Sequence, residues 1–244
     1  MISQETYNHY WAKGWAVVEH VFTAEEVDQI AALALDVSQK ELETAQDSYV
    51  VDKSADGELM PRKIMTPFRK HGDFQHFALD DRIIHLITDL VGEPPLLVTD
   101  QIFMKPPRFG SAKPYHQDNF YFECVPGDHV ITAWIALDDV DEENGCLRYI
   151  DGSHKAGIIP HEPLPGEPYN LVPPPERVDL QKESLAPVGK GGIVFHHSQT
   201  LHTSYRNESN RWRRGYATHW ASAKVTSTKD TIASAYFQQA DYPG

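Results

Sequence analysis

The sequence contains little cysteine and lacks long hydrophobic runs. Its two cysteines, Cys124 and Cys146, have neither CxxC nor CxxH spacing, which excludes a disulfide framework and a cysteine-rich zinc motif. No apolar stretch is long enough to cross a bilayer, and the polar, acidic residues 1–6 do not have the pattern of a signal peptide. We therefore expect a cytoplasmic protein that does not reside in a membrane.

Positive charge is also scarce. The 244 residues include 22 Lys and Arg against 35 Asp and Glu, a net charge of -13, which argues against a nucleic-acid or anionic-membrane partner. A small-molecule substrate remains compatible with this charge, because an anionic substrate needs only a local basic pocket. The chain is long enough to bury a full core, and we expect residues 1–244 to form a single domain.

The first part of the chain, about residues 1–92, carries the helical signals. Residues 14–22 predict a short strand, after which Thr23 and Glu26 form a capping box that begins a helix. One stripe of that helix is apolar and is expected to pack on a sheet. The stripe consists of Val27, Ile30, Ala31, Ala34 and Val37.

Residues 47–58 are polar and predict irregular structure, and Asp80 caps a second helix that ends at Gly92. Beyond it, over about residues 93–225, short β-rich segments alternate with turn signals. These segments are residues 96–104, 129–137, 146–150, 193–195 and 215–220. Helices followed by many short strands predict a mainly β fold, a sandwich or a barrel.

A proline-rich stretch, residues 158–187, interrupts the β-rich region. We expect it to have no secondary structure of its own. Long loops inside compact domains are usually functional or disordered, so we interpret this one as a lid or rim over the site. An ordered but inert surface crossing is the alternative.

His116 and Asp118 stand one residue apart among aromatic residues. Alternate side chains of a strand share a face, so the two side chains are expected to point the same way and to suggest a metal site. The chain has 13 histidines, and a hydrogen-bonded surface pair is the alternative. Residues 195–204 contain three more histidines and offer a third ligand. Two histidines and one carboxylate form the facial triad of non-haem Fe(II) oxygenases.

Several motifs together resemble the phytanoyl-CoA dioxygenase family of Fe(II)/2-oxoglutarate oxygenases. They occur in the same order and at similar separations as in that family. They are Lys105-Pro106-Pro107, His116-Gln117-Asp118 with Tyr121-Phe122, Ala133-Trp134, Asn144-Gly145-Cys146-Leu147, Gly152-Ser153-His154-Lys155 and residues 195–213. The resemblance implies a double-stranded β-helix, which is a jelly-roll or cupin-like core, with flanking helices.

The resemblance also implies the metal ligands. It assigns His116, Asp118 and His202 as the residues that hold iron at the catalytic centre. It favours His202 over His196 and His197, because the family's ligand opens a His-x-Ser segment. His196 and His197 directly follow a strand, so at most one faces inward, and His196 is a candidate for orienting the ligands.

The co-substrate site follows from the same resemblance. Arg213 falls at the family's spacing for binding the distal carboxylate of 2-oxoglutarate, a task that suits a planar guanidinium. Ser204 matches a hydroxyl that binds the same carboxylate. Further residues match positions that line this pocket, namely Gln117, Trp134 and Lys63. We expect Arg211 and Arg214 to be solvated surface charges.

The implied cofactors are Fe(II), 2-oxoglutarate and O2, with ascorbate as a supporting reductant. The implied reaction is hydroxylation of an aliphatic C–H bond with formation of succinate and CO2. Related halogenases replace the acidic ligand with a small residue, so the presence of Asp118 favours hydroxylation. Two alternatives stay open. One is a jelly-roll binding protein without catalysis, and the other is a cupin-like metalloenzyme that uses no 2-oxoglutarate.

The substrate is expected to be a small molecule: an acyl-CoA, an amino acid, a phosphonate or a natural product. Aromatic and polar residues next to Asp118 are expected to line its pocket, namely Asn119, Phe120 and Tyr121. Arg148 or Lys155 is the candidate partner for an acidic group of the substrate. The segment after Gly157 departs from the acyl-CoA enzyme, and no single molecule is assigned.

Overall fold

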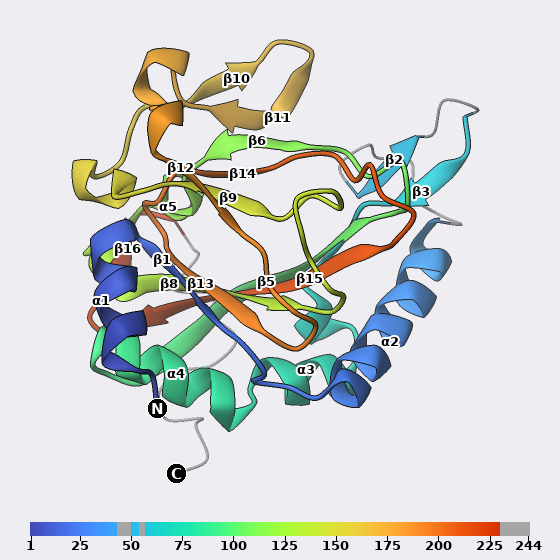
Figure 1. Cartoon of the computed structure of the whole chain (residues 1–244), viewed down its shortest axis with the longest axis horizontal. Coiled ribbons are helices and arrows are strands. Elements are labelled where there is room, and N and C mark those ends of the chain that lie inside the picture. The colour runs from blue at the N-terminus through green and yellow to red at the C-terminus, as the bar shows by residue number, and fades with distance from the viewer. Residues whose placement is uncertain (43–49, 54–56, 230–244) are drawn as a thin grey trace.

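Two antiparallel sheets face each other and form a jelly roll, as predicted (Figure 1). The computed structural model describes residues 1–42, 50–53 and 57–229. The larger sheet contains, in spatial order, β1 (Trp15–Val18), β13 (Ile193–His197), β8 (Val130–Ala136), β15 (Arg213–Ser222), β5 (Pro95–Lys105) and β4 (Lys63–Met65). The smaller sheet contains β12 (Glu183–Ala186), β9 (Leu147–Ile150), β14 (His202–Ser204) and β6 (Lys113–His116).

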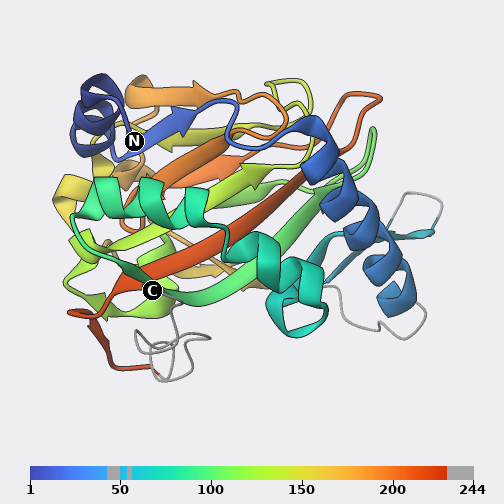
Figure 2. The same ribbon diagram turned by 90° about the horizontal axis from the view of Figure 1, so that it is seen from below.

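Helices cover the outer face of the larger sheet (Figure 2). They are α1 (Gln4–Lys13), α2 (Ala24–Leu42), α3 (Gly72–Ala78) and α4 (Asp81–Val91). The residues before position 93 also supply β1 and β4, the two edge strands of that sheet. Within the described ranges, no helix combines the length and apolarity needed to cross a bilayer.

The predicted helix boundaries are confirmed by their caps. The Thr23 N–H donates to Glu26 Oε2 over 2.8 Å, and the Glu26 N–H donates to Thr23 Oγ1 over 3.3 Å. These reciprocal bonds satisfy two amide groups that the first turn of α2 leaves without helical partners. Asp80 caps α4 through the Arg82 N–H, and Gly92 ends it at a φ of 81°. The positive φ suits a glycine, which has no Cβ.

The core lies between the helices and the larger sheet. Four of the five residues of the predicted stripe on α2 are buried, and Val37 is partly buried against the same core. Fully buried aromatic side chains on the sheet, including Phe195, Tyr216 and Trp220, complete this cluster. Burial of such side chains contributes roughly 1.5–3 kcal/mol each. This face is closed by apolar packing, so the site must lie on the other face, between the two sheets.

The prediction for residues 47–58 was wrong where the structure describes them. β2 (Val51–Lys53) pairs with β3 (Leu59–Pro61), whereas residues 47–49 and 54–56 lie outside the described residues. The expectation of a structureless stretch over residues 158–187 was also wrong. β10 (Glu162–Leu164) and β11 (Glu167–Val172) form a hairpin, and β12 joins the smaller sheet.

The prolines of this segment are compatible with the β10–β11 hairpin. Both strands of a two-stranded ribbon are edge strands, so a proline that lacks an N–H need not leave a hydrogen bond unmade. Among the helices, α1 and α3 carried no sequence signal that we recognised. In Figure 1 the hairpin lies above the smaller sheet, beside β6.

Candidate metal centre and co-substrate pocket

Three side chains from distant segments meet between the two sheets. His116 ends β6, His202 begins β14, and the two are paired across the sheet. Asp118 is the first residue of a short helix, α5 (Asp118–Phe122). One potential ligand atom from each of these residues lies within 4.8 Å of those of the other two. The structure therefore brings together the three residues that the resemblance assigned to iron.

The expected strand through His116 and Asp118 ends earlier than predicted. β6 stops at His116 and Asp118 is helical, but Gln117 between them is extended, with φ of −118° and ψ of 129°. One extended residue is enough to turn two flanking side chains to the same side. The prediction of a continuous strand was wrong, but the common direction of the two side chains holds.

Backbone carbonyl groups orient both histidines. His116 Nδ1 lies 2.9 Å from Pro114 O, and His202 Nδ1 lies 2.9 Å from Thr200 O. A carbonyl only accepts, so each Nδ1 carries the proton and each Nε2 presents its lone pair to the centre. The two Nε2 atoms each lie 3.6 Å from Asp118 Oδ1. This is the donor arrangement that a divalent metal requires.

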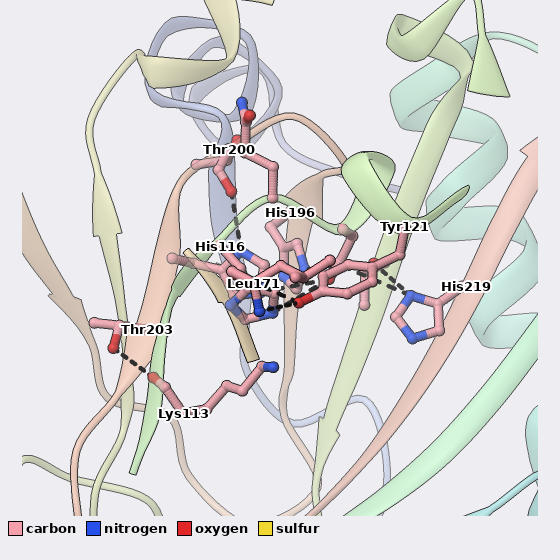
Figure 3. A network of polar contacts seen from close by, with 12 residues as sticks. Lys113, His116, Tyr121, Leu171, His196, Thr200, Thr203 and His219 are labelled. Atoms are coloured by element: carbon pink, nitrogen blue, oxygen red, sulfur yellow. Dashed lines mark hydrogen bonds and ion pairs between the residues drawn. The ribbon is translucent and has the colours of Figure 1, made fainter. Parts of the chain in front are cut away.

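The other carboxylate oxygen of Asp118 is held in place. Thr132 Oγ1 donates to Asp118 Oδ2 over 2.8 Å, and His196 Nε2 donates to the same oxygen over 2.9 Å. The Tyr149 hydroxyl bonds His196 Nδ1, and His219 Nδ1 bonds Thr132 Oγ1, at 2.9 and 2.8 Å. Figure 3 shows His196 next to His116, and His219 beyond the Tyr121 ring. Oδ1 is left as the atom that faces the two histidine ligands.

Charges around the centre favour metal binding. Burial alone would raise the pKa of Asp118, but the neighbouring His202 and His196 hold it well below its usual range. Burial, together with nearby His202 and Lys113, holds the pKa of His116 well below its usual range. A metal needs an ionised carboxylate and neutral imidazoles, and the directions of these two pKa shifts favour those forms for Asp118 and His116.

The Thr132 hydroxyl provides a prediction. Thr132→Val keeps the shape of the side chain but removes the hydrogen bond to Asp118, so metal affinity is expected to fall roughly 10- to 100-fold. Calorimetric titration with Mn(II) measures this directly. Thr218→Val is the matched control, because this buried threonine of β15 donates to the Ala133 carbonyl instead. Equal metal affinity of Thr132→Val and the unsubstituted protein would contradict the assignment.

His196 and His197 are the last two residues of β13, and their side chains face opposite sides, as expected. His196 contacts Asp118, whereas His197 Nε2 lies 3.1 Å from Asp128 Oδ1 and its ring lies 5.0 Å from that of His154. Burial, with His154 nearby, lowers the pKa of His197 to about 4. His197 is therefore neutral at pH 7 and belongs to the structure around β1 rather than to the metal centre.

Protonation of His197 should destabilise the fold in acid. The folded-state pKa lies below the unfolded value of 6.5, so the unfolded state binds more protons between these values and stability falls as pH drops from 6.5 towards 4. His197→Gln is expected to reduce the slope of unfolding free energy by about 1.4 kcal/mol per pH unit in this window. Urea unfolding at several pH values measures the slope, with exposed His76→Gln as control. An unchanged slope would show that His197 is not buried in its neutral form.

A cavity of about 1040 Å³ opens from the metal centre. Arg213 lies in its wall, 2% exposed, with its guanidinium 4.5 Å from the ring centroid of Trp134. Arg213 Nε and Nη2 are buried and have no hydrogen-bond partner among the described residues. Burial lowers the pKa of Arg213 to about 10, so the group is still charged at pH 7. A buried, unpaired cation is costly unless a ligand pairs with it.

A glycine makes room for the arrangement of Arg213 and Trp134. A Cβ placed on Gly215 would lie 1.7 Å from Trp134 Cζ2. Gly215 and Arg213 are alternate residues of β15, so they share a face. Ser204, at the end of β14, lines the same cavity and is 4% exposed. A carboxylate of the size of that in 2-oxoglutarate fits this cationic wall, because it would satisfy the orphaned guanidinium donors.

Of the other residues predicted to line the 2-oxoglutarate pocket, two lie in the cavity wall and one does not. Trp134 and Lys63 line the cavity, and Lys63 Nζ lies 6.0 Å from the Phe103 ring. Gln117 does not line it. Its amide donates to Gly157 O and Gln199 O, and its Oε1 accepts from the Ile159 N–H. All of these bonds direct Gln117 to the backbone behind the metal ligands, so the prediction for this side chain was wrong.

Of the three predicted pocket residues next to Asp118, only Tyr121 lines the cavity, and its role in substrate binding stays a prediction. The proline-rich segment, interpreted as a lid or rim, also lines the cavity, through Gly166, Glu167 and Asn170. Asn119 exchanges hydrogen bonds with the Cys124 backbone, and Phe120 stacks on His161 with ring centroids 4.3 Å apart. Arg148 is held between Glu142 and Glu183 by bonds of 2.7 and 2.8 Å. Neither Arg148 nor exposed Lys155 lines the cavity, so neither can hold a substrate group there.

The two arginines near Arg213 in the sequence, Arg211 and Arg214, differ in exposure and in their partners. Arg211 pairs with Asp141 at the surface, as expected, with 45% of its side chain exposed. Arg214 is only 14% exposed, forms a two-pronged pair with Asp138 and donates to Ala31 O in α2. The prediction that Arg214 is solvated was wrong, because α2 covers this end of β15.

Sequence reasoning missed two polar residues at the centre, Thr132 and His219. Thr132 is two residues before Trp134 in β8, so strand alternation could have placed both on the cavity face. Lys113, which also lines the cavity, was missed as well. It lies three residues before His116 and belongs to none of the motifs that carry the family resemblance.

Fold and site define an oxygenase of the iron- and 2-oxoglutarate-dependent class, with a His-Asp-His centre and a cationic co-substrate wall. The sequence matches the Phytanoyl-CoA dioxygenase (PhyH) family over residues 10–215, and the chain belongs to this family. Its cofactors are accordingly iron and 2-oxoglutarate.

Curated relatives agree with this family. The chain is 26% identical to a phytanoyl-CoA dioxygenase domain-containing protein 1 homolog of Caenorhabditis elegans, covering 87% of this chain and 88% of the relative. It is also 26% identical to the peroxisomal phytanoyl-CoA dioxygenase of Rattus norvegicus, covering 95% of this chain and 72% of the relative.

Solved structures share the fold. The carbocyclase SnoK from nogalamycin biosynthesis superposes with a TM-score of 0.73, at 24% identity over 96% of this chain and 90% of that one. The epimerase SnoN, in complex with Fe3+, alpha ketoglutarate and nogalamycin RO, has a TM-score of 0.72 at 23% identity, over 99% of this chain and 91% of that one. These likenesses concern the architecture.

Proposed function

We propose that this protein hydroxylates an aliphatic C–H bond of a small molecule, coupled to conversion of 2-oxoglutarate into succinate and CO2. One observation carries the proposal: the unpaired guanidinium of Arg213 lies in the same cavity as the three metal ligands. A binding protein without catalysis has no need for both features, and a cupin-like metalloenzyme without 2-oxoglutarate has no need for the buried cation.

Different residues would bind the metal and the co-substrate. His116, His202 and Asp118 Oδ1 would hold the iron, while Thr132 and His196 keep Asp118 Oδ2 engaged. When bound, iron together with 2-oxoglutarate and O2 supplies the oxidising power that no side chain has. Arg213 and Ser204 would hold the distal carboxylate of the co-substrate. The guanidinium is buried and lies over the Trp134 ring, so it needs little rearrangement to bind.

Several large apolar side chains also line the cavity. They are Leu59, Phe103, Phe109, Tyr121, Phe122 and Leu147. Such a wall suits an organic body and excludes water from the reacting carbon. Asp118 occupies the ligand position with a carboxylate, which favours return of a hydroxyl to the substrate over transfer of a halide.

Turnover of 2-oxoglutarate tests the proposal. The protein, supplied with Fe(II) and 2-oxoglutarate, is incubated with a library of candidate substrates under 18O2, and succinate and products are followed by mass spectrometry. We expect substrate-stimulated succinate and a product that gains one labelled oxygen atom. Succinate with a product that gains no oxygen would exclude hydroxylation, and no succinate under any condition would exclude 2-oxoglutarate turnover.

A further inference from the structure

The cavity has the opposite charge balance from the chain. Acidic residues outnumber Lys and Arg in the sequence, 35 to 22, but the cavity is lined by more cations than carboxylates. The cations are Arg62, Lys63, Lys105, Lys113, Arg206 and Arg213, and the carboxylates are Asp52, Asp118 and Glu167. A cleft lined by charges of one sign concentrates ligands of the other sign.

The cofactors do not use up this positive charge. The charges of Fe(II), Asp118, the 2-oxoglutarate dianion and Arg213 cancel one another. Lys105 is directed at the backbone, where its amine donates to Ser204 O over 3.2 Å and to Tyr205 O. Of the other cations, Arg62 pairs with Asp52 at 3.8 Å, and Lys63 was assigned to the 2-oxoglutarate pocket. Lys113 and Arg206 then face Glu167 as the remaining carboxylate of the cavity lining. The excess of positive charge is therefore left for the second organic substrate.

Lys113 is the cation best placed to contact that substrate. It begins β6, the strand that ends in the ligand His116, and its Nζ lies 5.6 Å from the ring centroid of Tyr121. The Tyr121 ring in turn lies 6.2 Å from the His116 ring. The amine and the metal centre thus lie beside the same aromatic side chain, and Figure 3 shows Lys113 extending towards this group.

The hydrogen bonds of Lys113 leave it able to bind an anion. Within the described part of the chain, its ammonium donates to one acceptor, Asn170 Oδ1, over 2.7 Å. An ammonium group has three donors, and Asn170 is neutral. Burial and nearby Arg62 lower the pKa of Lys113 to about 8, so the amine is mostly charged at pH 7.

The hairpin of the proline-rich segment holds this amine in place. Asn170 belongs to β11, and its amide nitrogen donates to Glu167 Oε2 over 2.5 Å. The Leu171 N–H donates to the Tyr121 hydroxyl over 3.2 Å. The hairpin therefore fixes both Lys113 and the aromatic ring beside it, which limits how the end of a substrate can lie in the cavity.

We infer that the substrate is an organic anion, a carboxylate or a phosphate-type acid with an apolar body, and that Lys113 binds its anionic group. Arg206 of the same cavity adds positive charge from the surface side. The apolar body would lie along the aromatic wall, which brings a carbon near the anionic group to the metal. This inference rests on the proposed function, because it concerns the second ligand of the same site.

Binding of matched probes tests the inference. The protein with Fe(II) and saturating 2-oxoglutarate, which occupies the Arg213 site, is titrated without O2 against octanoate, octylphosphonate and octan-1-ol by calorimetry. A charge-assisted hydrogen bond predicts that at least one anion binds roughly 10- to 100-fold more tightly than the alcohol. Tighter octanoate assigns a carboxylate and tighter octylphosphonate a phosphate-type group, and both support the inference.

Variants of Lys113 test whether this residue causes the preference for anions. Lys113→Met is expected to abolish the preference for anions, Lys113→Arg to retain it, and the control Lys155→Met, an exposed cation outside the cavity, to leave it unchanged. The Kd for 2-oxoglutarate should stay the same in all of them, which also shows that they are folded. Equal affinity for anions and alcohol in the unsubstituted protein, or a preference that survives in Lys113→Met, would overturn the inference.

The proposed function and the inference about the anionic substrate would be overturned by different results. Absence of succinate formation would overturn the proposed function but leaves the anion preference measurable as a binding property. Succinate formation without an anion preference would keep the proposed function and remove Lys113 from substrate recognition.

Discussion

Asp118→Ala is expected to abolish iron binding and 2-oxoglutarate turnover. Asp118 supplies the only carboxylate of the ligand set, and its Oδ1 faces both histidines at 3.6 Å. Loss of a residue that merely orients a ligand costs about 10- to 100-fold in metal affinity, and loss of the ligand itself should cost at least as much. Iron content after gel filtration and calorimetric titration with Mn(II) measure the effect.

Asp128→Ala is the matched control for this substitution. Asp128 also pairs with a buried histidine, His197, but its own side chain is 70% exposed and lies away from the cavity. We expect it to keep its iron content and activity. Asp118→Ala should lose some stability in the absence of metal, because it deprives Thr132 and His196 of an acceptor at roughly 1–3 kcal/mol. Normal metal affinity in Asp118→Ala would refute the proposed centre.

Local signals in the sequence were sufficient for much of the fold. The capping box at Thr23 and Glu26, and the pair Asp80 and Gly92, fix helix ends through bonds between residues close in sequence. The β-rich segments were located for the same reason, because alternation and turn residues are local properties. For these segments the type and the approximate ends were therefore predictable, whereas the strand expected through Asp118 is the helix α5.

What depends on distant neighbours was not predictable. Gln117 stands between two metal ligands, yet its amide bonds Gly157 and Gln199 from other loops. Arg214 is covered by α2, which lies more than a hundred residues earlier in the chain. Neither environment has a signature in the residues next to these positions. The family resemblance could assign a role to each matching position, but it could not give the direction of each side chain.

The same limit applies to the substrate side of the cavity. Arg148 and Lys155 were candidates because they lie near family motifs, whereas Lys113 became visible only when β6, Tyr121 and the hairpin were placed together. Asn170 lies 57 residues from Lys113 in sequence. The proposed recognition of the substrate depends on contacts between β6 and the β10–β11 hairpin, and only the fold brings these segments together.

Arg213→Met is expected to weaken 2-oxoglutarate binding by about 30-fold to several thousandfold. Truncating one partner of a buried, hydrogen-bonded charge pair costs roughly 2–5 kcal/mol, and the burial of Arg213 places it in this class. Calorimetric titration with 2-oxoglutarate measures the Kd, and the KM for 2-oxoglutarate should rise in parallel. Arg211→Met removes a neighbouring but exposed arginine and should leave both constants unchanged.

Stability of the protein without ligands gives an independent test of the same residue. Arg213 Nε and Nη2 are buried without partners among the described residues, so the charged group destabilises the ligand-free fold. Arg213→Met should therefore melt at the same temperature as the unsubstituted protein or higher, yet gain little from added 2-oxoglutarate, whereas the unsubstituted protein gains with concentration. A variant that is less stable without ligand but binds 2-oxoglutarate normally would show that Arg213 is a structural residue stacked on Trp134 and would remove the co-substrate site from this wall of the cavity.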